Sequence, residues 1–345
     1  MHRPHSLPRP HSLPRPGRRA PRAPALGLLA VAGLVLAGCA PGQLSTQSQR
    51  IAYDDPGDSC RPQVVALDST GNFFGAQILA GAAIGAGAGA LAGGLIGQNW
   101  QSALIGAGTG ALLGGTVAYW SALQQQSQNQ AVLDQRVSGD LIRENNAIDR
   151  TQFAFDRLTD CRYRQAEGVR EAYHAGRLDH AQAEAEMAHL RSLAAGDLQL
   201  AQLINRQIDD RGAQFATATT HLGVPPPPPL PQGNAFARRA VALRVSPRPD
   251  APTVGRLAPR QRVEVTGGRD GYALVRAPDG TQGYAEASDL AGPGLRTVTI
   301  ARARQSAPAE NVRTLAGSNA ARRDAFAQSV TVAQQAQASG FQLSS

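Results

Sequence analysis

Cysteine is the residue type whose chemistry is easiest to place in this sequence. The 345-residue chain has three cysteines, at positions 39, 60 and 161. Cys39 follows Ala37 and Gly38, small residues that let a chain lie extended in a protease site, and its thiolate is a nucleophile. Cys60 and Cys161 have no histidine at metal-ligand spacing. In an oxidising compartment these two would pair in a disulfide; the alternative is two unpaired thiols, with Cys161 packed on a helix face.

Known catalytic motifs are missing from the remaining sequence. It contains no Gly-x-Ser-x-Gly, no P-loop and no His-Glu-x-x-His, and its Gly-x-Gly steps follow no predicted strand. His174, His180 and His189 are scattered, without the Glu-x-x-His arrangement of a di-metal bundle. We therefore expect no catalytic residue, no metal site and no cofactor.

The first 38 residues have the three parts of a secretory signal. Six arginines and no acidic residue precede an apolar run, Ala25–Ala37, whose 13 residues are too few to cross a bilayer. The run ends in Leu36-Ala37-Gly38-Cys39, which resembles the lipobox of bacterial lipoproteins. In that family the cysteine takes up diacylglycerol and becomes the acylated N-terminus, which holds the protein to membrane lipid. The alternative is an ordinary secretory signal with a chance cysteine.

The residues after Cys39 bear on the destination that this resemblance implies. Lipoproteins that stay in the inner membrane usually have Asp directly after the cysteine, whereas Ala40 and Pro41 stand here. The resemblance therefore implies a cell-envelope protein that is lipid-anchored in the outer membrane and faces the periplasm.

Removal of the signal changes the interpretation of the charge. The whole chain carries a net charge of +8, with 34 basic and 26 acidic residues, and 6 of the basic residues lie in 1–38. The mature part therefore has 28 basic against 26 acidic residues, a net charge of about +2. It shows no basic patch with interleaved aromatic residues, so we expect no nucleic-acid partner.

A long uncharged segment, Ser69–Leu133, is rich in glycine. Its glycines recur mainly every fourth position, at Gly81, Gly85, Gly89, Gly93 and Gly97 and again at Gly106, Gly110 and Gly114. Residues four apart share one helix face, so each run forms a stripe along which another helix can approach closely. The pattern resembles the glycine-zipper domains of bacterial envelope proteins and predicts a helical hairpin over 74–120 that enters or lies on a membrane. A hairpin packed in the periplasm and a disordered loop are the alternatives, and identical stripes on neighbouring copies favour a homo-oligomer.

Residues 121–220 have apolar positions at helical spacing and predict two long helices, about 122–174 and 180–214, folded back on each other. Gly176 fits the position after a helix end, and Asp179 with Gln182 fits a capping box at the start of the next helix. We interpret the charged residues of this helical stalk as solvated faces.

The segment Pro225–Pro231 predicts a stiff polyproline II spacer between two independently folding parts. Beyond it, short apolar runs separated by turn residues predict a small β-barrel. The predicted strands are Ala240–Val245, Thr253–Leu257, Arg262–Val265, Gly271–Arg276 and Gln282–Glu286. A strand-like run at Thr297–Ile300 and a polar helix or tail over about 308–338 follow.

This barrel resembles the bacterial SH3 domain. The motifs that carry the resemblance are Val254-Gly255-Arg256-Leu257, Arg262-Val263-Glu264-Val265, Asp270-Gly271-Tyr272, Gly280-x-x-Gly283-Tyr284 and Ser288-Asp289-Leu290. The resemblance implies a module that binds peptidoglycan or an envelope protein without catalysis. Tyr272 and Tyr284 replace the tryptophans of the family, and they either form an aromatic ligand face or close the barrel.

The sequence as a whole predicts a multi-domain protein of α class with a small β module. We divide it into a signal peptide (1–38), a mature N-terminal linker (39–73), a glycine-zipper hairpin (74–120), a helical stalk (121–220), a Pro-rich linker (221–234), an SH3-like barrel (235–292) and a polar C-terminal tail or helix (293–345). The expected function is that of a non-enzymatic, membrane-anchored lipoprotein that binds peptidoglycan or an envelope partner. The alternative is an oligomeric subunit of an envelope pore or secretion-type assembly, formed through the glycine zipper.

Overall fold

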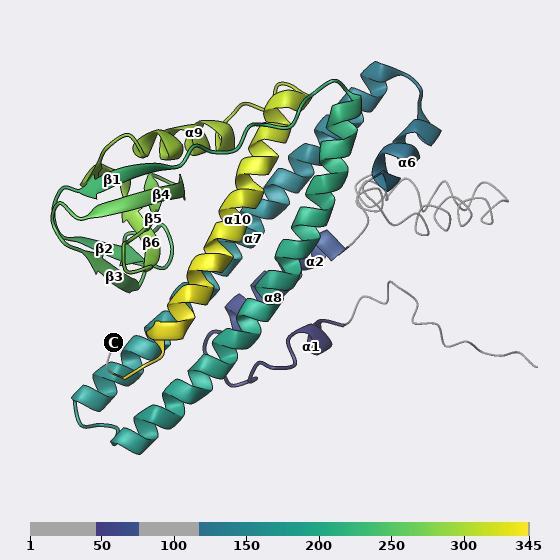
Figure 1. Cartoon of the computed structure of the whole chain (residues 1–345). Helices are drawn as coiled ribbons and strands as arrows, with labels where there is room; N and C mark the ends of the chain where they lie inside the picture. Colours follow the sequence, from purple (N-terminus) through teal and green to yellow (C-terminus); the bar gives the residue numbers. More distant parts are fainter. Residues whose placement is uncertain (1–45, 76–116, 344–345) are drawn as a thin grey trace, which may run out of the picture. The chain divides into compact units, whose positions relative to one another are not determined.

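The computed structural model describes residues 46–75 and 117–343 of the chain (Figure 1). The predicted signal, Cys39 and the predicted zipper glycines, Gly81 to Gly114, lie outside the described residues. Within the described part, no helix combines the length and the apolar character needed to cross a membrane.

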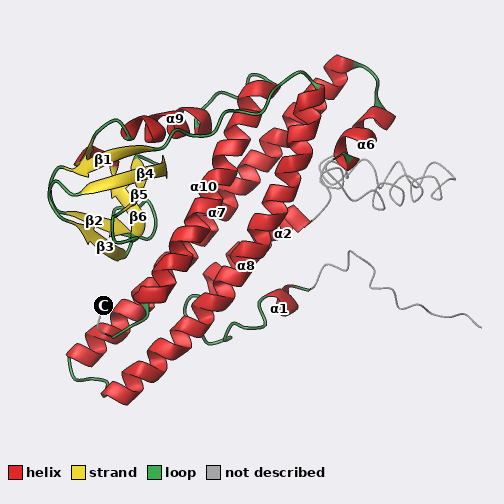
Figure 2. Ribbon diagram, in the orientation of Figure 1, coloured by secondary structure: helices red, strands yellow, loops and turns green. Residues whose placement is uncertain are grey.

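Two long antiparallel helices, α7 (Gln130–His174) and α8 (His180–His221), form the centre of a helical bundle (Figure 2). The turn between them has Gly176 in the left-handed region at φ 68°, and Asp179 and Gln182 form the predicted capping box. The first helix begins later than predicted because Asn129 caps it, its side chain accepting hydrogen bonds from the backbone of Ala131 and Val132. The residues before this cap form a separate helix, α6 (Ala118–Gln126).

Two further helices complete the bundle. Helix α10 (Val312–Gly340) and the shorter α2 (Arg61–Gly75) each pack against both α7 and α8 (Figure 1). The predicted C-terminal tail or helix is thus a helix, and it is partly internal: Phe326 and Val330 belong to the same buried core as residues of α2, α7 and α8. A one-turn helix, α1 (Gln47–Arg50), precedes α2.

The barrel consists of antiparallel strands in the order β3-β2-β6-β5-β4-β1-β7. The predicted strands correspond to β2 (Val241–Arg244), β3 (Thr253–Leu257), β4 (Arg262–Arg269), β5 (Tyr272–Arg276) and β6 (Gln282–Glu286). Strand β1 (Gly233–Ala237) was not predicted from the sequence, nor was the short β7 (Leu290–Ala291), which is preceded by a 3-10 turn, Ala287–Asp289.

The run Thr297–Ile300 is helical, and its prediction as a strand was wrong. It lies in α9 (Leu295–Gln305), which packs on β1, β4 and β5. Val298 and Ala301 are buried at 6% and 1% exposure, and their three-residue spacing puts both on the helix face that meets the barrel core. Tertiary packing therefore overrides the β-branched composition of the run.

The proline-rich segment runs alongside α9. The Arg304 guanidinium donates a hydrogen bond to the carbonyl of Pro228 at 2.8 Å, and the Thr297 hydroxyl donates one to the carbonyl of Pro231. The segment is thus tied to the element that follows the barrel.

Candidate functional site

The two tyrosines predicted as a ligand face lie on one side of the barrel, where α10 covers them. Tyr284 is 1% exposed and Tyr272 is 8% exposed, and both pack in one cluster with Leu274 and with Val332 of α10. The Tyr284 hydroxyl is 2.8 Å from the hydroxyl of Ser329, also on α10. The predicted aromatic surface is therefore not open, because a helix of the same chain occupies it.

A buried ion pair fixes this contact between barrel and bundle. The Arg269 guanidinium donates hydrogen bonds to both carboxylate oxygens of Asp156 on α7, each at 2.7 Å, and its carbon lies 5.5 Å from the ring centre of Tyr284. Both charged residues are 7% exposed. Burial opposes the charge of Arg269, but the neighbouring Asp156 outweighs burial and raises the pKa of the guanidinium above its usual range.

A second polar contact joins the β2–β3 loop to α7. The Ser246 hydroxyl donates to one oxygen of Asp160 at 2.8 Å, and the Arg248 guanidinium lies 3.6 Å from the other oxygen. Asp160 is 1% exposed, and this burial raises the pKa of its carboxyl to about 6, against the opposing effects of Ser246 and Arg248.

The interpretation of the stalk charges as solvated faces was wrong for several residues. Besides Asp156 and Asp160, Arg162 is 2% exposed and binds Asp197 at 2.6 Å, Asp58 at 2.5 Å and Asp54 at 3.2 Å. The charge of Arg162 can be buried because all three of its guanidinium nitrogens donate to carboxylates.

Next to Arg162, Cys161 forms a disulfide with Cys60, with 5.9 Å between the Cα atoms. The disulfide and the Arg162 ion pairs tie the segment before α2 to α7 and α8. Together they connect the start of the described chain to the bundle.

An open cleft of about 980 Å³ lies where the barrel loops, α7, α9 and α10 meet. Its lining includes Phe153 of α7, Arg302 of α9, Arg322 of α10, and Arg248 and Asp270 of the barrel. A volume in this range suits a small ligand or a short peptide.

Phe153 gives this cleft an aromatic wall. Its side chain is 62% exposed, although it lies on a helix whose neighbouring residues Gln152 and Ala154 are buried. The Arg157 guanidinium lies 5.9 Å from the centre of the ring. An exposed aromatic face beside a cation offers a surface for stacking and for apolar contact.

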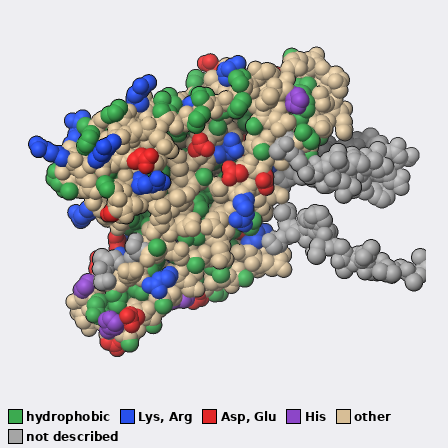
Figure 3. Space-filling view, viewed as in Figure 1, with side chains coloured by type: hydrophobic (Ala, Val, Ile, Leu, Met, Phe, Trp, Pro, Cys, Tyr) green, Lys and Arg blue, Asp and Glu red, His purple; other side chains and the backbone are tan. Residues whose placement is uncertain are grey.

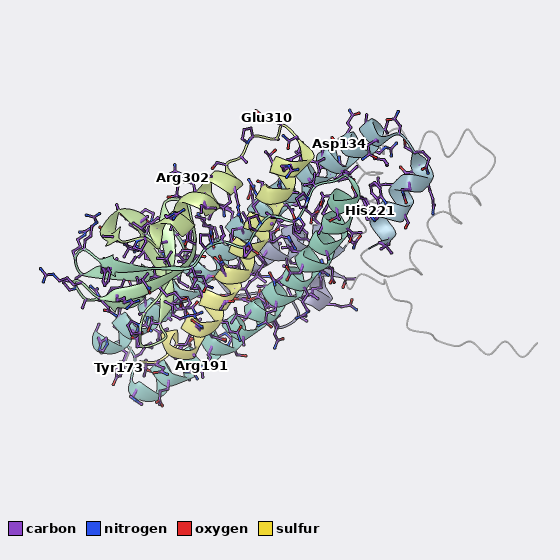
Figure 4. The ribbon with its side chains drawn as sticks, turned by 45° about the horizontal axis from the view of Figure 1, so that its top comes forward. Asp134, Tyr173, Arg191, His221, Arg302 and Glu310 are labelled. Carbon is purple, nitrogen blue, oxygen red and sulfur yellow. A yellow bond between two sulfur atoms is a disulfide. The ribbon has the colours of Figure 1, made fainter. Side chains whose placement is uncertain are left out.

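The arginines that line the cleft differ in whether an acidic side chain pairs with them. Arg322 donates to Asp149 at 2.8 Å, and Arg248 to Asp250 at 2.9 Å. Arg302, labelled in Figure 4, is exposed on α9. Among the described residues, no side chain or carbonyl pairs with its guanidinium. Arg302 therefore provides a cation that is available to an anionic group.

A second hollow of about 620 Å³ adjoins the cleft and shares Gly271, Arg302 and Ser306 with it. Its other lining residues include Leu295 and Val298, which make it more apolar. A ligand with a carboxylate at Arg302 could therefore place apolar groups on either side of it.

Neither Phe153 nor Arg302 was predicted from the sequence as a functional residue. Phe153 lies in a helix whose apolar positions were attributed to packing, and Arg302 follows a run predicted as a strand. The one available signal was the position of Phe153, two residues from Phe155 and hence on a different face of the helix.

Other predicted features have no counterpart among the described residues. Cys39 and the glycines Gly81, Gly85, Gly89, Gly93, Gly97, Gly106, Gly110 and Gly114 lie outside the described part, so lipidation and zipper contacts stay predictions. Within the described ranges, no group of three or more His, Cys, Asp or Glu side chains is arranged to hold a metal ion.

Comparison with known proteins supports one part of the chain. No curated protein and no solved structure shows a significant match to it. Residues 239–291 match the family model of the bacterial SH3 domain, over the stretch that forms β2 to β7. The family match therefore supports the SH3-like module predicted from the sequence, and the antiparallel strands β2 to β7 coincide with the matched stretch.

Proposed function

We propose that this protein is a non-enzymatic lipoprotein of the bacterial envelope whose SH3 module binds peptidoglycan or an envelope protein. The match of residues 239–291 to the bacterial SH3 domain carries this proposal, because such domains commonly bind peptidoglycan or proteins. Acylated Cys39 would hold the chain to the outer membrane, with the module in the periplasm. A glycine-zipper hairpin over 74–120 would add a second attachment and bring copies together as a homo-oligomer.

The disulfide between Cys60 and Cys161 supports an exported protein. Disulfides persist in oxidising compartments such as the periplasm and are rare in the cytosol. The pairing therefore agrees with a signal over residues 1–38, which the sequence suggests independently.

The geometry favours the cleft beside the barrel as the binding site. The aromatic face that the family resemblance suggested is occupied by α10, through Tyr284 and Ser329. The adjoining cleft has an exposed aromatic ring, Phe153, and an available guanidinium, Arg302. Peptides that carry carboxylates match this pair, since guanidinium binds carboxylate in a bidentate manner and the ring packs on aliphatic groups.

Co-sedimentation of the full chain with purified cell-wall sacculi tests the proposal. We expect the wild-type chain to sediment with sacculi, and Arg302→Gln and Phe153→Ser each to weaken binding about tenfold, as for loss of one charged hydrogen bond or one aromatic contact. Arg177→Gln and Ile142→Ser are matched controls, because Arg177 is exposed at the α7–α8 turn and Ile142 is 39% exposed on α7 outside the cleft.

Two results would contradict this assignment. If the wild-type chain stays in the supernatant and chemical crosslinking in cells captures no envelope protein, the proposed binding function is wrong. If the chain sediments but the cleft variants bind like their controls, binding takes place elsewhere on the module.

A further inference from the structure

The barrel and α9 carry an excess of positive charge. Residues 233–305 contain twelve arginines and six acidic residues, whereas the mature chain as a whole is close to neutral. Arginine side chains are accordingly prominent over the barrel and α9 in the space-filling view (Figure 3). This excess is not explained by the cleft, which pairs most of its arginines with acidic groups.

Part of the excess is concentrated where the end of β1 meets the β3–β4 turn. We call this surface the basic end and define it by Phe236, Arg238, Arg239, Arg260 and Arg262. Phe236 lies directly opposite Arg262 in the pairing of β1 with β4. The backbone amide of Arg260 donates to the carbonyl of Ala237 at 2.7 Å. The fold thus brings together two sequence segments that are more than twenty residues apart.

The arginines of the basic end are only partly compensated. Arg239 pairs with Asp289 at 2.9 Å, and Arg238 donates to a neutral acceptor, the carbonyl of Leu290, at 2.9 Å. Arg260 and Arg262 are exposed, and within the described residues neither guanidinium has an ion pair or a hydrogen bond. Four arginines therefore face one acidic partner.

Two features of the basic end do not contribute to the stability of the folded barrel. Phe236 is 46% exposed, although its neighbours Ala235 and Ala237 are buried in the barrel. Arg260 has φ 64°, in the left-handed region that disfavours side chains with a Cβ. Neither an exposed ring nor a strained, unpaired arginine stabilises the barrel, which points to a role at the surface.

We propose that the basic end docks the barrel onto a membrane surface that contains anionic phospholipid. Arginines attract the anionic headgroups, and an exposed aromatic ring among them enters the boundary between headgroups and acyl chains. A polyanion without aromatic bases would be attracted by the arginines alone and would gain little from the exposure of Phe236, and a single-stranded nucleic acid is bound by a series of aromatic rings where the basic end has one. The contact goes beyond the proposed function, since none of the five residues of the basic end lines the cleft.

Vesicle co-sedimentation of the mature chain, residues 39–345 with Cys39→Ser, tests this contact, since this chain lacks both the acylation site and the six arginines of the signal. Vesicles of phosphatidylcholine alone are compared with vesicles that contain an equal amount of phosphatidylglycerol. We expect stronger binding to the anionic vesicles, weakening as salt is added. Any contribution of the uncharged segment Ser69–Leu133 is the same for both vesicle types, because it carries no charge.

Variants then locate the surface. Arg260→Gln with Arg262→Gln should weaken binding to anionic vesicles about thirtyfold, which is about 2 kcal/mol for two arginines. Phe236→Ser should also weaken binding to anionic vesicles, and its effect should persist at high salt, because salt screens the arginines but not the apolar contact. Arg177→Gln with Arg313→Gln removes the same charge from exposed positions on or beside the bundle helices and should leave binding within about twofold of wild type. Circular dichroism and unchanged unfolding midpoints show that the variants are folded.

The proposal is overturned if both vesicle types bind equally, or if the basic-end pair and the control pair weaken binding alike. Tighter binding of single-stranded DNA than of anionic vesicles would replace the membrane by nucleic acid as the partner. Sacculus binding is expected to survive in the Arg260/Arg262 variant, so failure here is separable from failure of the proposed wall-binding function.

Discussion

Buried arginines form several of the specific polar contacts inside the described part of this protein. The sequence has no lysine, and Arg162, Arg211 and Arg269 are each more than nine-tenths buried with carboxylate partners. A guanidinium can satisfy several carboxylates at once because its donors point in fixed, divergent directions. The sequence predicted that these charges lie on solvated faces. Helical periodicity identifies apolar stripes, but it cannot show that a charged residue on the buried face has a partner from a distant segment of the chain.

Asp160 leads to a prediction about pH. Its folded-state pKa of about 6 lies above the ordinary value of 3.8, so the folded protein binds this proton more tightly than the unfolded chain. Stability should therefore rise as pH falls from 7 through 6, and from pH 7 to pH 5 this one group should contribute about 1 kcal/mol. Denaturant unfolding of wild type and Asp160→Asn at both pH values measures it.

Asn at position 160 can still accept the hydrogen bond of Ser246 but does not titrate. We expect the gain in unfolding free energy between pH 7 and pH 5 to be smaller by about 1 kcal/mol in Asp160→Asn than in wild type. Other buried carboxyls, such as Asp197, have a pKa raised mainly by burial and add the same trend to both proteins, so only the difference is diagnostic. Equal gains in the two proteins would refute the role of Asp160.

Helix α10 joins the barrel to the bundle, as α7 does through Asp156 and Asp160. Its residues Phe326 and Val330 pack into the helical core, while Ser329 and Val332 cover the tyrosine face of the barrel. The sequence indicated a polar helix or tail here because alanine, glutamine and arginine dilute the apolar positions. Its two partners lie on different sides of the helix, so no single stripe stands out in the sequence.

The buried pair Arg269–Asp156 gives this joint a measurable test. Arg269→Met leaves Asp156 buried without its partner and should destabilise the protein by about 3–5 kcal/mol. Arg269→Met combined with Asp156→Leu removes both charges and should recover most of that loss. Denaturant unfolding monitored by circular dichroism measures both. A double variant as unstable as the single one would show that the ion pair is not what couples the barrel to α7.

The element-scale predictions succeeded where local signals and packing agree. The turn after α7, the capping box of α8 and the strands β2 to β6 follow from glycine, capping and turn residues that act over a few positions. Strand β1 was missed because Gly-Asn-Ala-Phe-Ala has little β propensity and exists through pairing with β4. The cleft could not be predicted, since its walls come from segments whose packing depends on α10.

At the scale of the whole molecule, one covalent bond connects the two ends of a long stretch of chain. Cys60 and Cys161 are 101 residues apart, so their disulfide restricts the unfolded chain strongly. Cys60→Ser with Cys161→Ser should lower the free energy of unfolding by about 4–5 kcal/mol, as the loop-entropy relation gives for this separation.

The same loss should appear when wild type is treated with a reductant, and the double-serine variant should not respond to it. Thermal unfolding with and without dithiothreitol measures both effects. Identical unfolding of the oxidised and reduced wild-type protein would mean that the disulfide does not stabilise this fold.

The disulfide also determines how the chain would carry mechanical load. Tension between the N-terminal end and the barrel would pass from Cys60 straight to Cys161 through the sulfur–sulfur bond and on into α7. Residues 61–160 would then form a covalently bypassed loop that is not extended by the pull. For load that enters at an acylated Cys39, the loop would thereby stay unextended, whereas reduction of the bond would let the same force reach it.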